Sequence, residues 1–107
     1  MKLNYVNQDI VGGFATAEKL ALLGNSAAQA LVGNMYGSGA GVAASQPKAL
    51  LNLNFAALDG NHEAHLALGY RYHNGIGVKK SCSAAQRHYA IVAADVASNA
   101  QVQQQRS

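Results

Sequence analysis

The chain has 107 residues, a formal net charge of +3, one cysteine and no tryptophan. This length suits one small domain, and the single cysteine disfavours a disulfide-stapled fold. The basic residues are scattered, with only Lys79 and Lys80 adjacent, whereas a nucleic-acid surface shows a basic stripe or cluster. We therefore expect no nucleic-acid partner. We also expect no direct membrane insertion, because no apolar run approaches the ~20 residues of a spanning helix.

An ungapped internal repeat with a period of 36 residues is the most informative feature of the sequence. This shift places Gly24 on Gly60, and one third of the positions in 24–59 are identical to those in 60–95. A fixed period of about 20 to 50 residues is typical of stacked repeat proteins. The shared residues include Gly33/Gly69, Tyr36/Tyr72, Gly39/Gly75, Gly41/Gly77 and Ser45/Ser81.

In chain order, residues 1–13 are polar and end in Gly12-Gly13, so we expect a disordered or frayed lead-in. Residues 14–23 are rich in good helix formers and stop at Gly24, which predicts a helix. In the register of the repeat, this helix occupies the place of a second helix. The chain is therefore expected to begin inside a partial repeat, 14–23.

Two complete repeats follow, over 24–59 and 60–97, within a repeat domain of 14–98. The first is expected to have helices over 26–36 and about 46–59, joined by the turn 37–45. The second is expected to have helices over about 62–73 and 82–98, joined by the turn 74–81. Ser45 and Ser81 are predicted to cap the second helix of each pair. The glutamine-rich residues 99–107 are expected to form a polar tail that frays.

The repeated glycines predict close contacts and tight turns. Gly33 and Gly69 fall in mid-helix, where glycine costs ~1 kcal/mol relative to alanine, so we expect a neighbouring helix to approach closely there. Tyr36 and Tyr72 are expected to fill the wider gap at the helix end. Tyr89 lies on the predicted apolar face of the last helix. The residues expected to adopt positive φ in the turns are Gly39, Gly41, Gly75 and Gly77.

This spacing resembles the Sel-1-like repeat, a relative of the tetratricopeptide repeat. The resemblance covers residues 14–97 and implies an all-α fold, a short α-solenoid of antiparallel helix pairs with about two and a half repeats. The matching segments are Leu68-Gly69-Tyr70-Arg71-Tyr72, Gly75-Ile76-Gly77-Val78, Ala85, Tyr89 and Ala93.

The segments Gly69-Tyr70-Arg71-Tyr72 and Ser81-Cys82 further resemble the Sel-1-like adaptor family of Hrd-type ubiquitin ligases. That resemblance implies a protein-interaction scaffold in the endoplasmic reticulum, with a membrane ubiquitin ligase and misfolded proteins as partners. The first nine residues lack the apolar core of a secretory signal, so on this interpretation the chain is a fragment or a truncated relative. The alternative is a regulatory or structural repeat protein of bacterial type, outside this pathway.

Partner binding by stacked helix pairs uses the concave face that the first helices form. We expect His65, Tyr70, Arg71 and His73 to be exposed on that face and to contact a partner. Tyr70 is the best candidate, because its counterpart in the first repeat is Asn34 and the aromatic side chain is not explained by the repeat.

The sequence contains no motif for catalysis, a metal or a cofactor. His62 and His65 share a helix face, but zinc needs three or four converging ligands, so we interpret the histidines as packing or solvated residues. Cys82 starts a predicted helix, and a reactive thiol is the alternative to a small half-buried residue there. The glycine turns are not phosphate loops, because no strand precedes them and no Gly-Lys-Ser/Thr follows.

Two and a half repeats leave apolar faces uncovered, since about three repeats are needed for stability. We therefore expect the isolated chain to be weakly stable or to self-associate. Sedimentation velocity and thermal melting followed by circular dichroism measure both properties. A monomer that melts cooperatively at micromolar concentration would contradict this expectation.

Overall fold

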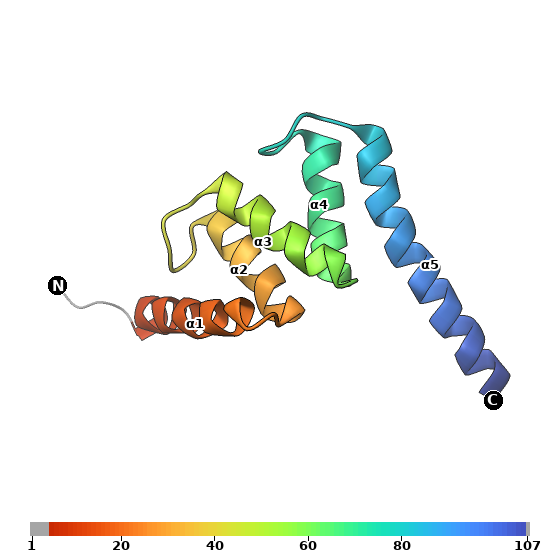
Figure 1. Ribbon diagram of the computed structural model, residues 1–107, viewed down its shortest axis with the longest axis horizontal. Coiled ribbons are helices and arrows are strands. Elements are labelled where there is room, and N and C mark those ends of the chain that lie inside the picture. The colour runs from red at the N-terminus through yellow and green to blue at the C-terminus, as the bar shows by residue number, and fades with distance from the viewer. Residues whose placement is uncertain (1–4, 107) are drawn as a thin grey trace. The chain divides into compact units, whose positions relative to one another are not determined.

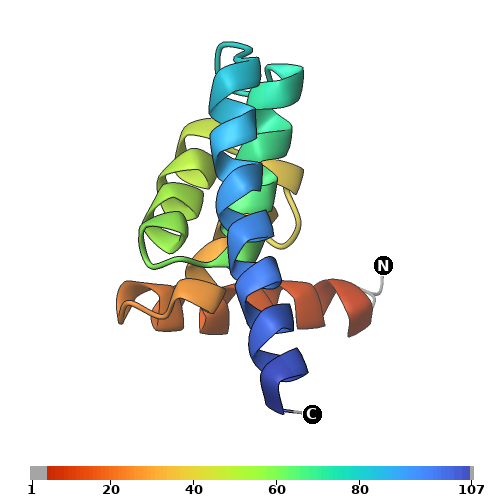
Figure 2. The same cartoon turned by 90° about the vertical axis from the view of Figure 1, so that its right-hand side faces the viewer.

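The computed structural model describes residues 5–106, with side chains described from residue 9 to residue 100. Within this range the chain is all-helical and its helices form antiparallel pairs, as predicted (Figures 1 and 2). It divides into two compact units, Met1–Ala64 and His65–Ser107. The helices are α1 (Tyr5–Leu22), α2 (Ser26–Ser38), α3 (Gln46–Leu58), α4 (His62–Asn74) and α5 (Cys82–Arg106).

The first helix starts earlier than the sequence predicted. Because α1 begins at Tyr5, the expected frayed lead-in is wrong for residues 5–13, and residues 1–4 lie outside the described range. Gly12 and Gly13 remain helical although each costs ~1 kcal/mol relative to alanine. Contact with the first repeat offsets this cost: a Cβ on Gly41 would lie 2.7 Å from the carbonyl oxygen of Ile10.

Both serine caps predicted for the second helices are present. Ser45 Oγ accepts a hydrogen bond from the backbone N–H of Lys48 at 3.3 Å, and Ser81 Oγ accepts one from Ala84 at 3.1 Å. Each cap satisfies one of the backbone donors that a helix start leaves unpaired. The first helices have asparagine caps that the sequence analysis did not assign, Asn25 on Ala28 and Asn61 on Ala64, both at 2.9 Å.

The turn between the helices closes in the same way in both repeats. The backbone N–H of Ser45 donates to the carbonyl oxygen of Tyr36, and that of Ser81 donates to Tyr72, both at 2.9 Å. The chain reverses between these anchors through glycines in the left-handed region, a conformation that other residues rarely adopt. Their φ values are 76° at Gly39, 74° at Gly41, 69° at Gly75 and 72° at Gly77.

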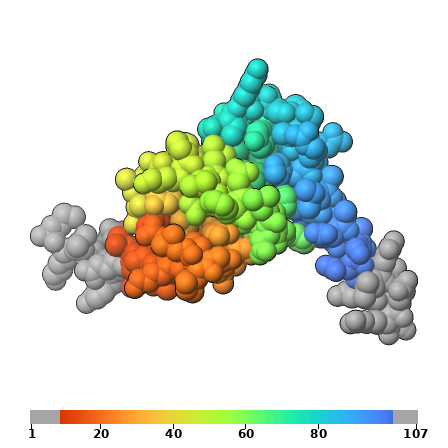
Figure 3. Space-filling view, in the orientation of Figure 1, coloured from red at the N-terminus to blue at the C-terminus, as the bar shows by residue number. Residues whose placement is uncertain are grey.

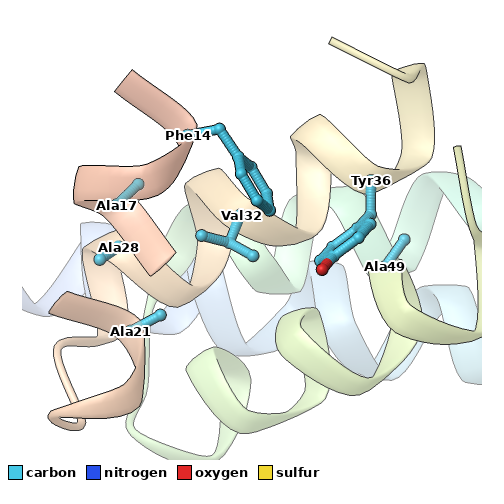
Figure 4. Close-up of a cluster of buried hydrophobic side chains, with 7 residues drawn as sticks. All are labelled: Phe14, Ala17, Ala21, Ala28, Val32, Tyr36 and Ala49. Atoms are coloured by element: carbon cyan, nitrogen blue, oxygen red, sulfur yellow. The ribbon is translucent and has the colours of Figure 1, made fainter. Parts of the chain in front are cut away.

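A cluster of buried side chains joins the three helices of the first unit (Figure 4). Its two aromatic rings, Phe14 on α1 and Tyr36 on α2, meet edge to face with their centroids 5.3 Å apart. Alanines supply most of the remaining surface, so the helices approach closely and little apolar area is buried per residue. The other members are Ala17, Ala21, Ala28, Val32 and Ala49.

The helices of each pair approach closely at the mid-helix glycine. A Cβ on Gly33 of α2 would lie 2.8 Å from Leu53 Cγ of α3. A Cβ on Gly69 of α4 would lie 2.6 Å from Tyr89 Cε1 of α5. Leu53 and Tyr89 are themselves 36 residues apart, so both pairs place a large side chain of the second helix over the glycine of the first.

The last helix continues beyond its predicted end. α5 runs to Arg106, so the expectation of a frayed polar tail is wrong for residues 99–106, and Ser107 lies outside the described range. Alanine and glutamine are good helix formers, and no glycine or proline interrupts them. The predicted apolar face of α5 is buried only near its start: Ala85 is buried, whereas Val96 is 56% exposed.

Replacing Gly33 by alanine is expected to destabilise the fold by about 1–3 kcal/mol, because the added methyl group overlaps the buried Leu53 and lies 3.1 Å from the backbone oxygen of Ala49. Gly69→Ala should cost less, because it overlaps only the ring of Tyr89, which is 37% exposed and can move. Urea unfolding followed by circular dichroism measures this change. Gly13→Ala is the matched control: nothing lies within 4 Å of a Cβ there, so better helix propensity should stabilise by up to about 1 kcal/mol. Equal effects at the three positions would refute the close-approach explanation.

Candidate protein-interaction surface

The first helix of each repeat presents one exposed face, which we call the helix-A face. On each helix separately, this face combines positions that are exposed in both repeats with one exposed apolar side chain, Leu31 on α2 and Leu66 on α4. Spacings of seven and four residues place the shared positions along one side of a helix. They are Ala27, Asn34 and Ser38 on α2 and, 36 residues later, Glu63, Tyr70 and Asn74 on α4.

The four residues predicted to contact a partner lie on different sides of α4. Tyr70 is 59% exposed and His73 is also exposed, so both are accessible. His65 and Arg71 are only 6% and 8% exposed, so the expectation that they are exposed is wrong. His65 faces α5 and contacts His88 there. Arg71 points toward the turn that follows α4.

Arg71 holds the turn that follows α4. Its Nη1 donates to the carbonyl oxygen of Ile76 at 3.3 Å, and its own carbonyl oxygen accepts from the backbone N–H of Ile76 at 2.9 Å. Burial lowers the pKa of the guanidinium from its usual value, because desolvation disfavours the charged form. The side chain is therefore a structural part of the second repeat.

Two imidazoles meet where α4 packs against α5. His65 Nδ1 and His88 Nδ1 are 2.9 Å apart, with ring centroids separated by 5.2 Å. The ring of Tyr72 stacks on that of His88, with their centroids 5.8 Å apart and an angle of 11° between their planes. Burial lowers the pKa of His88 from its ordinary value, and the neighbouring His65 and Arg87 lower it further.

The same register positions of the first repeat carry amides and lie in an open cleft. His65, Tyr72 and His88 correspond to Gln29, Tyr36 and Asn52, which line a cleft of about 430 Å³ in the first unit. Side chains of α1 and α3 form its walls, and the surfaces of these two helices adjoin on the face shown in Figure 3. This cleft was not predicted from the sequence, although the repeat register already brings the three residues into correspondence.

Charged groups from both walls of this cleft meet Tyr36. The Tyr36 hydroxyl donates to Glu18 Oε2 at 3.3 Å, and Lys48 Nζ lies 5.5 Å from the ring centroid. Burial raises the pKa of Tyr36, and the Glu18 carboxylate raises it further. The cleft thus combines an apolar floor with a few converging polar groups, a pattern typical of binding sites.

The described residues contain no cluster of three or more His, Cys, Asp or Glu side chains placed to hold a metal ion. Cys82, expected to be half-buried, is instead exposed at the first turn of α5. Among the helices that the structure describes, none is both long and apolar enough to cross a bilayer.

These features define an α-solenoid protein built from helix-pair repeats. The chain belongs to the Sel1 repeat family, whose model matches residues 26–61 and 62–94. Human protein sel-1 homolog 2 is 36% identical over 90 residues, which cover 84% of this chain and 13% of that protein. The mouse protein of the same name is also 36% identical, over 86 residues and 12% of its length. This chain therefore spans about an eighth of the curated relatives it matches.

Two bacterial structures share the fold of this chain. A Sel1 repeat protein from Oxalobacter formigenes superposes with a TM-score of 0.75 and 29% identity, over 84% of this chain and 76% of that one. The protective antigen c5321, which is present in uropathogenic Escherichia coli strains and displays an SLR fold, gives a TM-score of 0.77 and 28% identity. That match covers 82% of this chain and 19% of the antigen.

Replacing Arg71 by alanine is expected to destabilise the second repeat by about 1.5–3 kcal/mol, because its charged hydrogen bond to the turn is lost. Tyr70→Ala is the adjacent control and should change stability by no more than about 0.5 kcal/mol, since the ring is exposed. Urea midpoints of the two variants measure the difference. Tyr70→Ala proving the more harmful change would contradict this assignment of roles.

Proposed function

We propose that this chain is a protein–protein interaction scaffold that binds its partner on the helix-A face, without catalysing a reaction. Membership of the Sel1 repeat family supports binding as its general role. The observation that carries the proposal is the exposure of two apolar side chains on the helix-A face of α4, Leu66 and Tyr70. Exposed apolar side chains grouped on one face are typical of interaction sites.

Tyr70 is the proposed centre of binding within the second repeat. Tyrosine is enriched at interfaces because it combines a large apolar ring with a polar hydroxyl. Its counterpart Asn34 is also exposed, so stacking of the repeats does not require an aromatic residue at this position. We propose that the exposed His73, which lies one turn further along α4, also contacts the partner.

The finer proposal concerns the setting of the scaffold. The segments Gly69-Tyr70-Arg71-Tyr72 and Ser81-Cys82 resemble the adaptor of Hrd-type ubiquitin ligases, which supports a role in the endoplasmic reticulum with a ligase and misfolded proteins as partners. The bacterial Sel1 repeat structures favour the alternative, a regulatory or structural protein outside that pathway. Both settings use the same binding face, so one experiment addresses the surface and the partner.

The test is a pull-down of the tagged protein from its own cells, quantified by mass spectrometry, with and without Leu66→Ala/Tyr70→Ala. We expect the double variant to recover its partner at least about tenfold less well, as for the loss of an interface hot spot. Ile91→Ala is the control, because Ile91 is an exposed apolar residue of α5 away from the helix-A face. Unchanged recovery by the double variant would reject the proposed surface.

The identity of the recovered proteins decides between the two settings. A membrane ubiquitin ligase recovered with lumenal chaperones supports the adaptor. Soluble cytosolic or periplasmic partners alone support the bacterial-type scaffold and reject the adaptor.

A further inference from the structure

The His65–His88 contact has a limited capacity for protons. The two Nδ1 atoms are 2.9 Å apart, a distance at which one nitrogen carries a hydrogen and donates it while the other accepts. The neutral pair satisfies this requirement with one Nδ1–H between the rings. In the donor ring Nε2 then carries no hydrogen, whereas in the acceptor ring Nε2 is protonated.

One additional proton is compatible with this contact. It binds at the free Nε2 of the donor ring, so the charged imidazole still donates its Nδ1–H to the neutral partner, and the hydrogen bond becomes charge-assisted. A second proton must bind at the accepting Nδ1, the only acceptor left. Two N–H groups then face each other and two positive charges lie on adjacent rings, so the contact cannot persist.

The groups that face the pair favour separation of the two rings once both are charged. From α4 these are His65 and the ring of Tyr72, and on α5 the neighbouring Arg87 adds a positive charge close to His88. Burial further disfavours the charged form of His88. Among the residue types that face the pair, only histidine has an unperturbed pKa close to neutral.

The first repeat provides an internal comparison at the same register positions. Gln29 stands in place of His65 and Asn52 in place of His88. Their side-chain amides donate to backbone carbonyls, Gln29 to Ala21 at 3.3 Å and Asn52 to Lys48 at 2.9 Å. Amides do not titrate in this pH range, so the repeat fold accommodates a version of this site that is insensitive to pH.

We propose that the His65–His88 pair is a proton-responsive latch, which holds α4 and α5 together while one ring stays neutral and releases α5 when both rings are charged. Release also loosens the contact between Gly69 and Tyr89, which joins the same two helices. The second repeat, with the helix-A face of α4, is therefore regulated by mild acid independently of the first.

The direction of the effect follows from proton linkage. The pKa of His88 is lower in the folded chain than its ordinary value of 6.5, so the unfolded chain binds the proton more readily. The latch contributes its full stability above that ordinary value. Its contribution to the free energy of unfolding decreases as the pH falls below 6.5. The decrease ends only when the pH is below the pKa of His88 in the folded chain.

The first experiment measures hydrogen exchange of the amides of α5 at about pH 7.5 and about pH 5.5, corrected for the intrinsic exchange rate, on the whole chain. We expect protection of residues 82–95 to fall by up to about tenfold, since complete exclusion of one proton from the folded chain, at one pH unit below the ordinary pKa of histidine, changes the folding constant by that factor. The variant His65→Gln/His88→Asn, which carries the residues of the first repeat, should lose this pH response. The control His73→Gln, at an exposed histidine outside the pair, should keep it.

A pH response of the double variant equal to that of the unmodified chain would overturn the proposal. The second experiment needs no variant and decides the question even if the double variant does not fold. Imidazole ¹⁵N spectra of the unmodified chain should show two linked protonation steps for His65 and His88, with α5 losing protection at the second. Independent protonation of both rings with α5 still protected would reject the latch.

Discussion

The close approach of two helices at a mid-helix glycine is the constraint on which the rest of this structure depends. A side chain at Gly33 or Gly69 would overlap Leu53 or the ring of Tyr89, which occupy the space where a Cβ would lie. This contact fixes the distance between the helices of each pair. It also explains why so much of the core is alanine: larger side chains would separate the helices and break the contact.

A core of this kind places unusual weight on its few large side chains. Val32, Leu53 and Leu68 are the largest fully buried residues among those the structure describes, and each buries far more apolar area than the alanines around it. Local hydrogen bonds at the helix starts and turns also help to determine the path of the chain. The serine and asparagine caps satisfy the helix starts, and backbone bonds close each turn, so the path of the chain does not depend on core volume alone.

The functional hypotheses rest on residues that differ between the two repeats, because the residues that the repeats share already account for the fold. Position 34 is asparagine in the first repeat and its counterpart, position 70, is tyrosine, although both are exposed. Gln29 and Asn52 of the first repeat are replaced by His65 and His88 in the second, which converts two amides into a pair of titratable rings in contact. One fold thus presents two chemically distinct sites at equivalent positions.

The helix pairs, turns and caps were predictable from the sequence, because glycine, serine and proline act locally and recur with a period of 36 residues. The outer ends of α1 and α5 were not, because helicity near Gly12-Gly13 depends on contacts such as that of Ile10 with Gly41. Tertiary packing alone decided the burial of His65 and Arg71. On a short helix of nearly even polarity, the buried side is chosen by the partner helix, since periodicity carries too little contrast to select it.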